Sequence, residues 1–314
     1  FLNMLQLIGW TSIMIYDAML ALQTLAPLSP MIWTIAIGAL VILWLFIGLH
    51  NTGYIQAIVS ILLLGLTLYM GTHMISQWPS EGGLLTSGNM SFIAALELSI
   101  AMPLSWLPLI SDYTRESKHP FTASLTSATV YTVTSIVMYT LGLSAAIFGG
   151  GDSIITIMMN AGLGLAGLIV IIFSTVTTTF MDAYSAGVSS TTIYNSASSK
   201  GIAVIVTIVG TIAAILYPMD DITDFLYLIG SVFTPMIAIL LADYFMNRQQ
   251  VQTLSAFLVR GTIWAVSVGL YHYMLHSEST VGATLPAFTM AFIITTIIGF
   301  VSKAVKVSTE VKQP

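Results

Sequence analysis

STVTTTFMDAYS, residues 174–185, decides the fold class, because it lies inside an apolar run, residues 163–188, that is long enough to cross a bilayer. One carboxylate, Asp182, falls within that run. A carboxylate at the middle of a membrane costs about 3 kcal/mol on insertion scales, so it needs a partner or a water-filled cavity. The threonines that share a helical stripe with this acid, at i−7, i−4 and i−3, are Thr175, Thr178 and Thr179.

This stripe has two interpretations. A hydroxyl-lined face that ends in an acid supplies the oxygens that a dehydrated small cation or a small polar ligand needs, and Ser174, Thr177 and Thr178 form an overlapping hydroxyl face. Alternatively, the hydroxyls bond back to carbonyls of the preceding turn or to a neighbouring helix, and their role is structural. Acids embedded in a membrane are functional by default, so we follow the first interpretation as a hypothesis.

The composition of the whole chain indicates an all-α polytopic membrane protein. Of its 314 residues, 56% are hydrophobic and only 7% are charged, whereas soluble domains carry about 25% charged residues. The chain has no cysteine, which excludes a disulfide framework and a thiolate site. Its formal net charge of −5 argues against a nucleic-acid partner. Because Phe1 is not an initiator and no signal peptide precedes the first apolar run, we expect a longer parent chain.

Apolar runs of about 20 residues predict ten membrane spans within one transmembrane domain, residues 1–304. Proline, glycine, asparagine and acidic residues separate the runs and supply turn chemistry. The predicted spans are residues 1–24, 31–49, 54–74, 92–111, 122–149, 163–190, 201–217, 222–246, 253–276 and 284–304, followed by a tail at 305–314.

The cationic residues predict the orientation of these spans. Lysine and arginine follow spans four, six, eight and ten, whereas the intervening loops hold acids and neither lysine nor arginine. Arg260 is the exception, and it lies in the first turns of span nine on the same side. The positive-inside rule therefore places the C-terminus in the cytoplasm, and we expect a multi-pass protein of the inner (plasma) membrane. It also predicts an even number of preceding spans if the parent chain begins inside the cell.

The first span carries three residues on one helical stripe, Trp10, Met14 and Asp17. A tryptophan in a membrane protein is often an interface anchor. Trp10 lies in the middle of the span rather than at an end, so stacking on a planar ligand is the equal alternative. Asp17 is a second acid within the membrane, and it is either a proton-coupling or cation-binding residue or a hydrogen-bond partner of a neighbouring helix.

The fourth span contains two prolines, Pro103 and Pro108, within one and a half turns. The loss of two backbone donors predicts an interrupted helix, and broken helices near the midplane indicate a transporter binding site. A simple proline kink is the alternative. Glu97 lies earlier on this span on the face of Leu104, and it is the other candidate for a proton-coupling residue.

Three stretches of this chain together carry a resemblance to a known family. They are LQLIGWTSIM at 5–14, WLPLISDYTR at 106–115 and TPMIAILLADYF at 234–245. In these stretches the chain resembles the nucleobase:cation symporter-1 family of purine/cytosine permease type, and most of all its CytX branch of hydroxymethylpyrimidine transporters. The resemblance implies the leucine-transporter fold, with two inverted five-helix repeats and two further helices. On that template the first two transmembrane helices are missing, and spans one, four and six become helices three, six and eight.

The resemblance also implies the roles of individual residues. Trp10 and Trp106 stack on the two faces of a planar ring, and Asp182 replaces an amide that bonds the heterocycle. An acid at this position suits amidine-type donors, such as those of an aminopyrimidine. Met14 replaces a residue that is polar in some relatives, which leaves that contact open. The implied substrate site is Trp10, Met14, Ser105, Trp106, Thr178 and Asp182, and the implied cation site is Ser174, Thr177 and Thr178.

These observations lead to one functional hypothesis. The chain is a secondary active transporter, a cation-coupled symporter that imports a pyrimidine-type heterocycle, and the substrate we favour is the thiamine precursor hydroxymethylpyrimidine. On this hypothesis it is not an enzyme, and it needs no cofactor beyond a coupling ion, sodium or a proton. Its partners are the heterocycle and the lipid bilayer, with no nucleic acid and no obligate protein partner.

Three alternatives stay open. Within the family, the chain is instead a cytosine, purine or allantoin permease. A channel would need a continuous polar lining, whereas polar stripes lie mainly on spans one, four and six. An intramembrane aspartyl protease would pair Tyr16-Asp17 with the glycine-rich segment 149–151 and Asp152, although four spans separate these two motifs.

Overall fold

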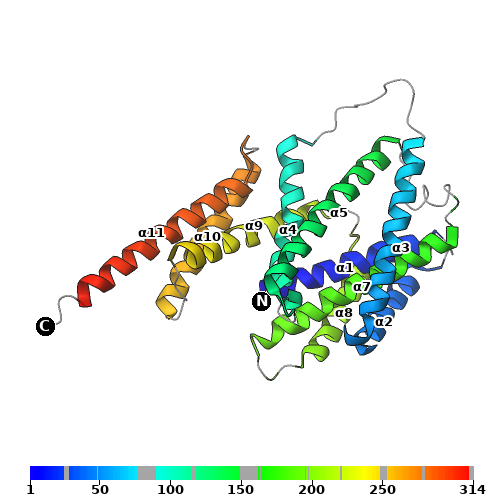
Figure 1. Ribbon diagram of the computed structural model, residues 1–314, viewed down its shortest axis with the longest axis horizontal. Coiled ribbons are helices and arrows are strands. Elements are labelled where there is room, and N and C mark those ends of the chain that lie inside the picture. Colours follow the sequence, from blue (N-terminus) through cyan, green and yellow to red (C-terminus); the bar gives the residue numbers. More distant parts are fainter. Residues whose placement is uncertain are drawn as a thin grey trace. The chain divides into compact units, whose positions relative to one another are not determined.

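The computed structural model describes most of the chain as helices (Figure 1). Within the described residues, ten helices are long and apolar enough to cross a membrane, which confirms the predicted all-α polytopic fold. The described residues are 1–24, 28–47, 49–76, 90–114, 117–148, 162, 164–194, 196, 198–219, 221–247, 253–277 and 280–310.

The helices follow one another with short connections, and one π-helical turn, η1, directly continues the ninth helix. Their bounds are α1 Leu2–Gln23, α2 Pro30–Ile47, α3 Leu49–Ser76, α4 Phe92–Thr114, α5 Pro120–Phe148, α7 Gly164–Thr191, α8 Ser199–Leu216, α9 Thr223–Leu241, η1 Ala242–Asn247, α10 Leu254–His276 and α11 Thr284–Glu310.

Helix α4 corrects one prediction. It runs without interruption through Pro103 and Pro108, so the expected break in this span is wrong. A proline removes one backbone donor, and a membrane helix tolerates this where neighbouring groups satisfy the freed carbonyl. The Ser105 hydroxyl, between the two prolines, donates to the Met102 carbonyl at 2.7 Å. Side-chain donors of this kind supplement the backbone ladder, and the helix continues.

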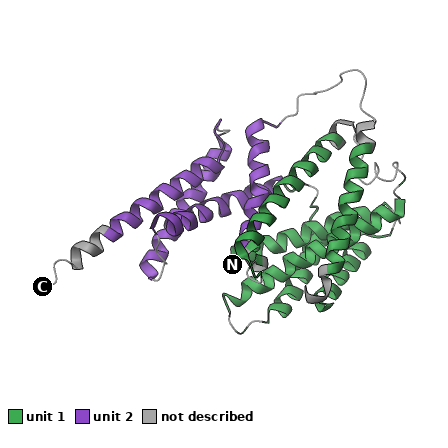
Figure 2. Cartoon of the chain, in the orientation of Figure 1, with its two compact units in different colours: residues 1–86, 109–222 green, residues 87–108, 223–314 purple. Residues whose placement is uncertain are grey.

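The chain divides into two compact units (Figure 2). Unit 1 comprises residues 1–86 and 109–222, and unit 2 comprises residues 87–108 and 223–314, so α4 contributes to both. In unit 1, α1, α2, α7 and α8 all pack against one another, and α3 packs against α7 and α5. Leu7 and Ile15 of α1 and Phe180 and Ala183 of α7 are among its fully buried side chains.

Small residues allow the helices of unit 1 to approach closely. Within a membrane, helices associate through van der Waals packing rather than through the exclusion of water, so small residues gather at their interfaces. A Cβ atom added at Gly210 of α8 would lie 2.7 Å from Thr11 Cγ2 and 3.3 Å from the Ser12 amide nitrogen of α1. Gly210 therefore sets the separation of α1 and α8 at the turn that carries Trp10.

Valine at Gly210 should lower the stability of the protein. Its side chain would push against Thr11 and Ser12, and overpacking of this kind costs about 1–3 kcal/mol. We expect a lower melting temperature in detergent micelles. Gly142→Val on α5 is the matched control, because no atom lies within 4 Å of a Cβ at that position. Equal melting temperatures for the two variants would contradict the close approach of α1 and α8.

In unit 2, α9, α10 and α11 pack against one another, and η1 packs against α9 and α11. The Trp264 indole nitrogen of α10 donates to the Val232 carbonyl of α9 at 2.9 Å. Ala238, Ile263 and Ala291, one from each helix, form a buried cluster between them. The three helices thus form a tight bundle that supports both ends of the unit.

Candidate functional site

Helices α1 and α7 form the centre of the candidate site, and they run antiparallel. Near the start of α1, Asn3 Nδ2 donates to the Ser189 hydroxyl near the end of α7 at 2.8 Å. The two helices pack against each other beyond this bond. The Asn3–Ser189 bond therefore provides a reference point from which positions along the pair can be compared.

The antiparallel arrangement places the predicted site residues at matching levels. Trp10 follows Asn3 by seven residues and Asp182 precedes Ser189 by seven, so both lie roughly 10 Å from the reference bond at about 1.5 Å per residue. The next level pairs Met14 with Thr178, each eleven residues from the same bond. Four of the predicted substrate residues thus come from two facing helices and occupy two adjacent turns.

Asp182 is a buried acid without a protein partner in the described part of the chain. Its side chain is 6% exposed, and no hydrogen bond or ion pair joins it to another described residue. An ionisable side chain buried without a partner is costly, and it persists where function requires it. This observation distinguishes Asp182 from a residue that merely packs.

The hydroxyls around Asp182 fall into two groups. Thr177 and Thr179 donate to carbonyls of their own helix, those of Ser174 at 3.0 Å and Thr175 at 2.7 Å. The side chains of Ser174 and Thr178 make no hydrogen bond to another described residue. Ser174, Thr178 and Asp182 follow each other at i, i+4 and i+8, so their uncommitted oxygens share one face of α7. The structural interpretation therefore fits Thr177 and Thr179, and the ligand interpretation fits Ser174, Thr178 and Asp182.

The remaining predicted residues have more varied environments. Trp10 is 9% exposed, whereas Met14 is half-buried. Asp17 is exposed on α1. Ser105 is buried and Trp106 half-buried on the part of α4 that belongs to unit 2 (Figure 2). Glu97 is buried on the same segment of α4, where its carboxylate accepts hydrogen bonds from the first residues of α11.

A buried polar network in unit 2 was not predicted. Asp243 of η1 accepts two hydrogen bonds from Arg260 of α10, from Nε at 3.1 Å and from Nη2 at 2.9 Å. Asn247 donates to Asp243 at 3.0 Å and to the Thr295 carbonyl of α11 at 3.0 Å. Gly299 of α11 leaves the space that the Asn247 side chain occupies. The network joins η1, α10 and α11, so Arg260 is a structural ion-pair partner rather than an exception to the charge pattern.

Two chemistries outside transport find little support in the described residues. No group of three or more histidine, aspartate or glutamate side chains is placed to hold a metal ion within the described ranges. For the aspartyl-protease alternative, Asp17 is exposed on α1, and Asp152 lies outside the described residues.

Comparison with protein families gives a match over nearly the whole chain. The model of a family described as permeases for cytosine/purines, uracil, thiamine and allantoin matches residues 1–313. The cytosine permease of Escherichia coli strain K12 is 25% identical over 185 residues, which make up 58% of this chain and 44% of the permease. The cytosine permease of Escherichia coli O157:H7 matches to the same extent. The chain therefore spans less than half the length of the curated relatives it matches.

Among solved structures, the chain is similar to Mhp1, a nucleobase-cation-symport-1 family transporter in a closed conformation with bromovinylhydantoin bound. The TM-score is 0.75 at 16% identity, and the match covers 96% of this chain and 75% of Mhp1. At this identity the similarity concerns the fold alone. It confirms the leucine-transporter-like fold that the sequence resemblance implied.

Proposed function

Because the chain belongs to the family of permeases for cytosine/purines, uracil, thiamine and allantoin, we propose that it is a cation-coupled symporter that imports a pyrimidine-type heterocycle. The observation that carries this proposal is Asp182, a buried carboxylate at the level of Trp10 with no hydrogen bond to another described residue. A carboxylate only accepts hydrogen bonds, so it selects a ring that presents N–H donors. Hydroxymethylpyrimidine, an aminopyrimidine, meets this requirement.

The substrate site in this proposal combines an aromatic platform with a charged acceptor. Trp10 stacks on the ring, Trp106 covers the opposite face, and Asp182 fixes the orientation by accepting from the amidine-type donors. Stacking and a few hydrogen bonds at about 1–2 kcal/mol each would give micromolar affinity. Such affinity suits a transporter that scavenges its substrate.

The coupling ion in this proposal binds next to the substrate on α7. Ser174, Thr177 and Thr178 offer the hydroxyl oxygens, and Thr177 still has lone pairs to offer because its bond to the Ser174 carbonyl uses only its proton. Ion and substrate can move the alternating-access equilibrium only if they bind one conformation better than the other. A shared face for both ligands on α7 gives each of them influence over the same helix.

The test is an uptake measurement with the complete gene product in proteoliposomes. Radiolabelled hydroxymethylpyrimidine, cytosine, uracil and allantoin are offered separately, with an inward gradient of sodium, of protons or of neither. We expect hydroxymethylpyrimidine to accumulate under one of the two gradients and to be outcompeted least by uracil. Accumulation of none of the four rings under either gradient would contradict the proposal.

Two neighbouring threonines allow a matched test of the α7 face. Thr178→Val should raise the half-saturating concentration of the coupling ion or of the substrate by about tenfold, because one ligand hydrogen bond of about 1–1.5 kcal/mol is lost. Thr179→Val is the control, since the Thr179 hydroxyl donates to the Thr175 carbonyl at 2.7 Å and is fully buried. Kinetics of uptake across ion concentrations measure both variants. An equal effect of the two substitutions would mean that α7 presents no ligand-binding face.

A further inference from the structure

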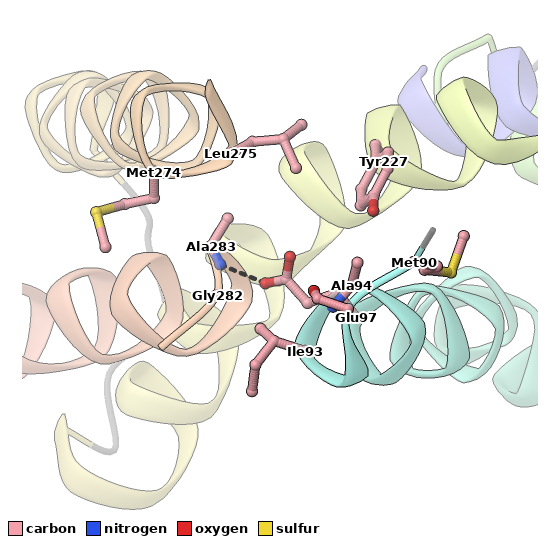
Figure 3. A pocket seen from close by; sticks show the side chains of 10 residues that line it. Met90, Ile93, Ala94, Glu97, Tyr227, Met274, Leu275, Gly282 and Ala283 are labelled. Carbon is pink, nitrogen blue, oxygen red and sulfur yellow. Dashed lines mark hydrogen bonds between the residues drawn. The ribbon is translucent and has the colours of Figure 1, made fainter. Parts of the chain in front are cut away.

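Unit 2 contains a cavity of about 570 Å³ that is separate from the residues proposed to bind the heterocycle (Figure 3). It lies where the first turns of α4, α9 and α11 meet the last turn of α10. Glu97 and Trp106 are nine residues apart on α4, which places them roughly 13 Å apart along the axis and on opposite faces of the helix. The cavity around Glu97 is therefore not the pocket of Trp106.

Glu97 supplies the charge of this cavity. Its side chain is 7% exposed, and its Oε1 atom accepts hydrogen bonds from the backbone amides of Ala283 and of Thr284, the latter at 2.6 Å. Gly282 has a φ of 77°, and a Cβ atom there would lie 2.6 Å from the same carboxylate oxygen. The turn before α11 is thus shaped around the carboxylate.

The second carboxylate oxygen is available to a ligand. In Figure 3 it points away from the bond to Ala283 and toward the side chains of Tyr227 and Leu275. No hydrogen bond joins it to another residue in the described part of the chain. The only partner of Glu97 among these residues is therefore the start of α11, which engages one oxygen.

The cavity keeps a net negative charge. The start of a helix offsets about half of one elementary charge, and none of the described residues that line the cavity is lysine, arginine or histidine. The nearest further charge on α9, Asp224, acts on Tyr227 with the same sign as Glu97. An occupant of this cavity must therefore carry positive charge.

The walls decide which kind of cation fits. Apart from Glu97 and the Tyr227 phenol, the lining is mainly apolar and includes Met90, Met274 and Leu275. A single carboxylate gives too few oxygens for a divalent metal, which takes six or more. A cavity of this volume is in the range of small-molecule sites. An ammonium group attached to a short apolar chain matches both the charge and the walls.

We propose that the Glu97 cavity binds an organic monocation of this type, with its ammonium group paired to the free oxygen of Glu97 and next to Tyr227. The apolar part lies against Met90, Met274 and Leu275. The ammonium comes either from a free amine or from the headgroup of phosphatidylethanolamine in the surrounding bilayer. The occupant joins α4 to α9, α10 and α11. This site does not depend on the proposed transport activity, and its test needs no transported substrate.

The test measures melting temperature of the complete protein in nanodiscs of phosphatidylglycerol, with hexylammonium chloride or 1-hexanol as probes of equal length. Hexylammonium should raise the melting temperature by about 2–4 °C more than hexanol does. Glu97→Gln retains an acceptor for α11 and removes the charge, so it should weaken the response to hexylammonium by about tenfold in concentration. Asp224→Asn removes an exposed acid of the same unit and should leave the response unchanged. Equal shifts with the two probes, or a parental response in Glu97→Gln, would overturn the site.

A second variant keeps the test decisive if Glu97→Gln does not fold. Ala94→Phe places a ring in the cavity and preserves the carboxylate, so it should abolish the hexylammonium shift. An unchanged shift in this variant would place the probe elsewhere and overturn the proposal. Nanodiscs of phosphatidylethanolamine identify the source of the ammonium. A higher melting temperature that requires Glu97, with no further effect of hexylammonium, identifies the lipid headgroup, whereas an intact hexylammonium response identifies a free amine.

Discussion

Asp182→Ala should reduce uptake of labelled hydroxymethylpyrimidine at sub-saturating concentration by about 100-fold in the complete protein. Hydrogen bonds to a charged group contribute about 1.5–3 kcal/mol, and each 1.4 kcal/mol corresponds to a factor of ten. Asp182 has no hydrogen bond to another described residue, so the alanine variant loses ligand contacts and little else. Initial rates over a range of substrate concentrations measure the effect.

The same substitution should not lower the stability of the protein. A buried acid without a partner is itself unfavourable by about 3 kcal/mol on membrane-insertion scales, and its removal costs no hydrogen bond within the described protein. We expect the melting temperature of Asp182→Ala to equal or exceed that of the parent. Loss of uptake together with retained stability separates a ligand-binding role from a structural one, because a structural residue would lose both.

Asp182→Asn is the matched control for charge. It keeps the size and one acceptor oxygen but adds N–H donors, so it should favour rings that present carbonyl acceptors, such as uracil, over an aminopyrimidine. Competition between the two labelled rings measures this change of preference. Uptake by Asp182→Ala at the parental rate would remove Asp182 from the substrate site.

Long, strongly periodic features could be predicted from the sequence. The apolar runs indicated membrane helices because about 20 apolar residues are needed to cross the hydrocarbon core, and α7 covers the run around Asp182. The proline rule failed at α4, because the prolines at 103 and 108 remove only single donors and the surroundings of a membrane helix compensate them. Local spacing identifies a helix, but it does not decide whether a proline bends or ends it.

Relations between distant helices could not be predicted from local spacing. The matching levels of Trp10 and Asp182 depend on the antiparallel pairing of α1 and α7, which the Asn3–Ser189 bond fixes across 186 residues of sequence. The resemblance to a family named both residues, but their spacing alone could not. The uncommitted state of Thr178 and the committed state of Thr179 also require the structure, because both lie on the stripe that the sequence indicates.

The ion pair of unit 2 is the clearest feature that the sequence analysis missed. Asp243 and Arg260 lie 17 residues apart on different helical elements, so no helical periodicity relates them. The i, i+4 relation of Asp243 and Asn247 is local, and the observed bond between them shows that this spacing carried a usable signal. The π-helical form of η1 brings both side chains into the space between α10 and α11, where Asn247 is fully buried.

Arg260→Met should therefore destabilise the protein by about 3–5 kcal/mol, because it leaves the carboxylate of Asp243 buried without its charged partner. The exposed fractions of the two side chains, 12% for Arg260 and 11% for Asp243, show that solvent reaches neither charge freely. Methionine preserves the apolar stem of the arginine, so the effect reports the charge rather than lost packing. Unfolding in detergent, followed by tryptophan fluorescence and expressed as a melting temperature, measures the change.

The double variant Asp243→Asn with Arg260→Met isolates the pair interaction. Once both charges are gone, no uncompensated ion is left in the interior, so the double variant should be more stable than Arg260→Met alone. Asparagine at 243 still accepts the hydrogen bond from Asn247, which keeps the link to the Thr295 carbonyl in place. If instead the double variant were as unstable as the sum of the two single variants, the two charges would act independently, and the observed bidentate contact would contribute nothing to holding η1 against α10.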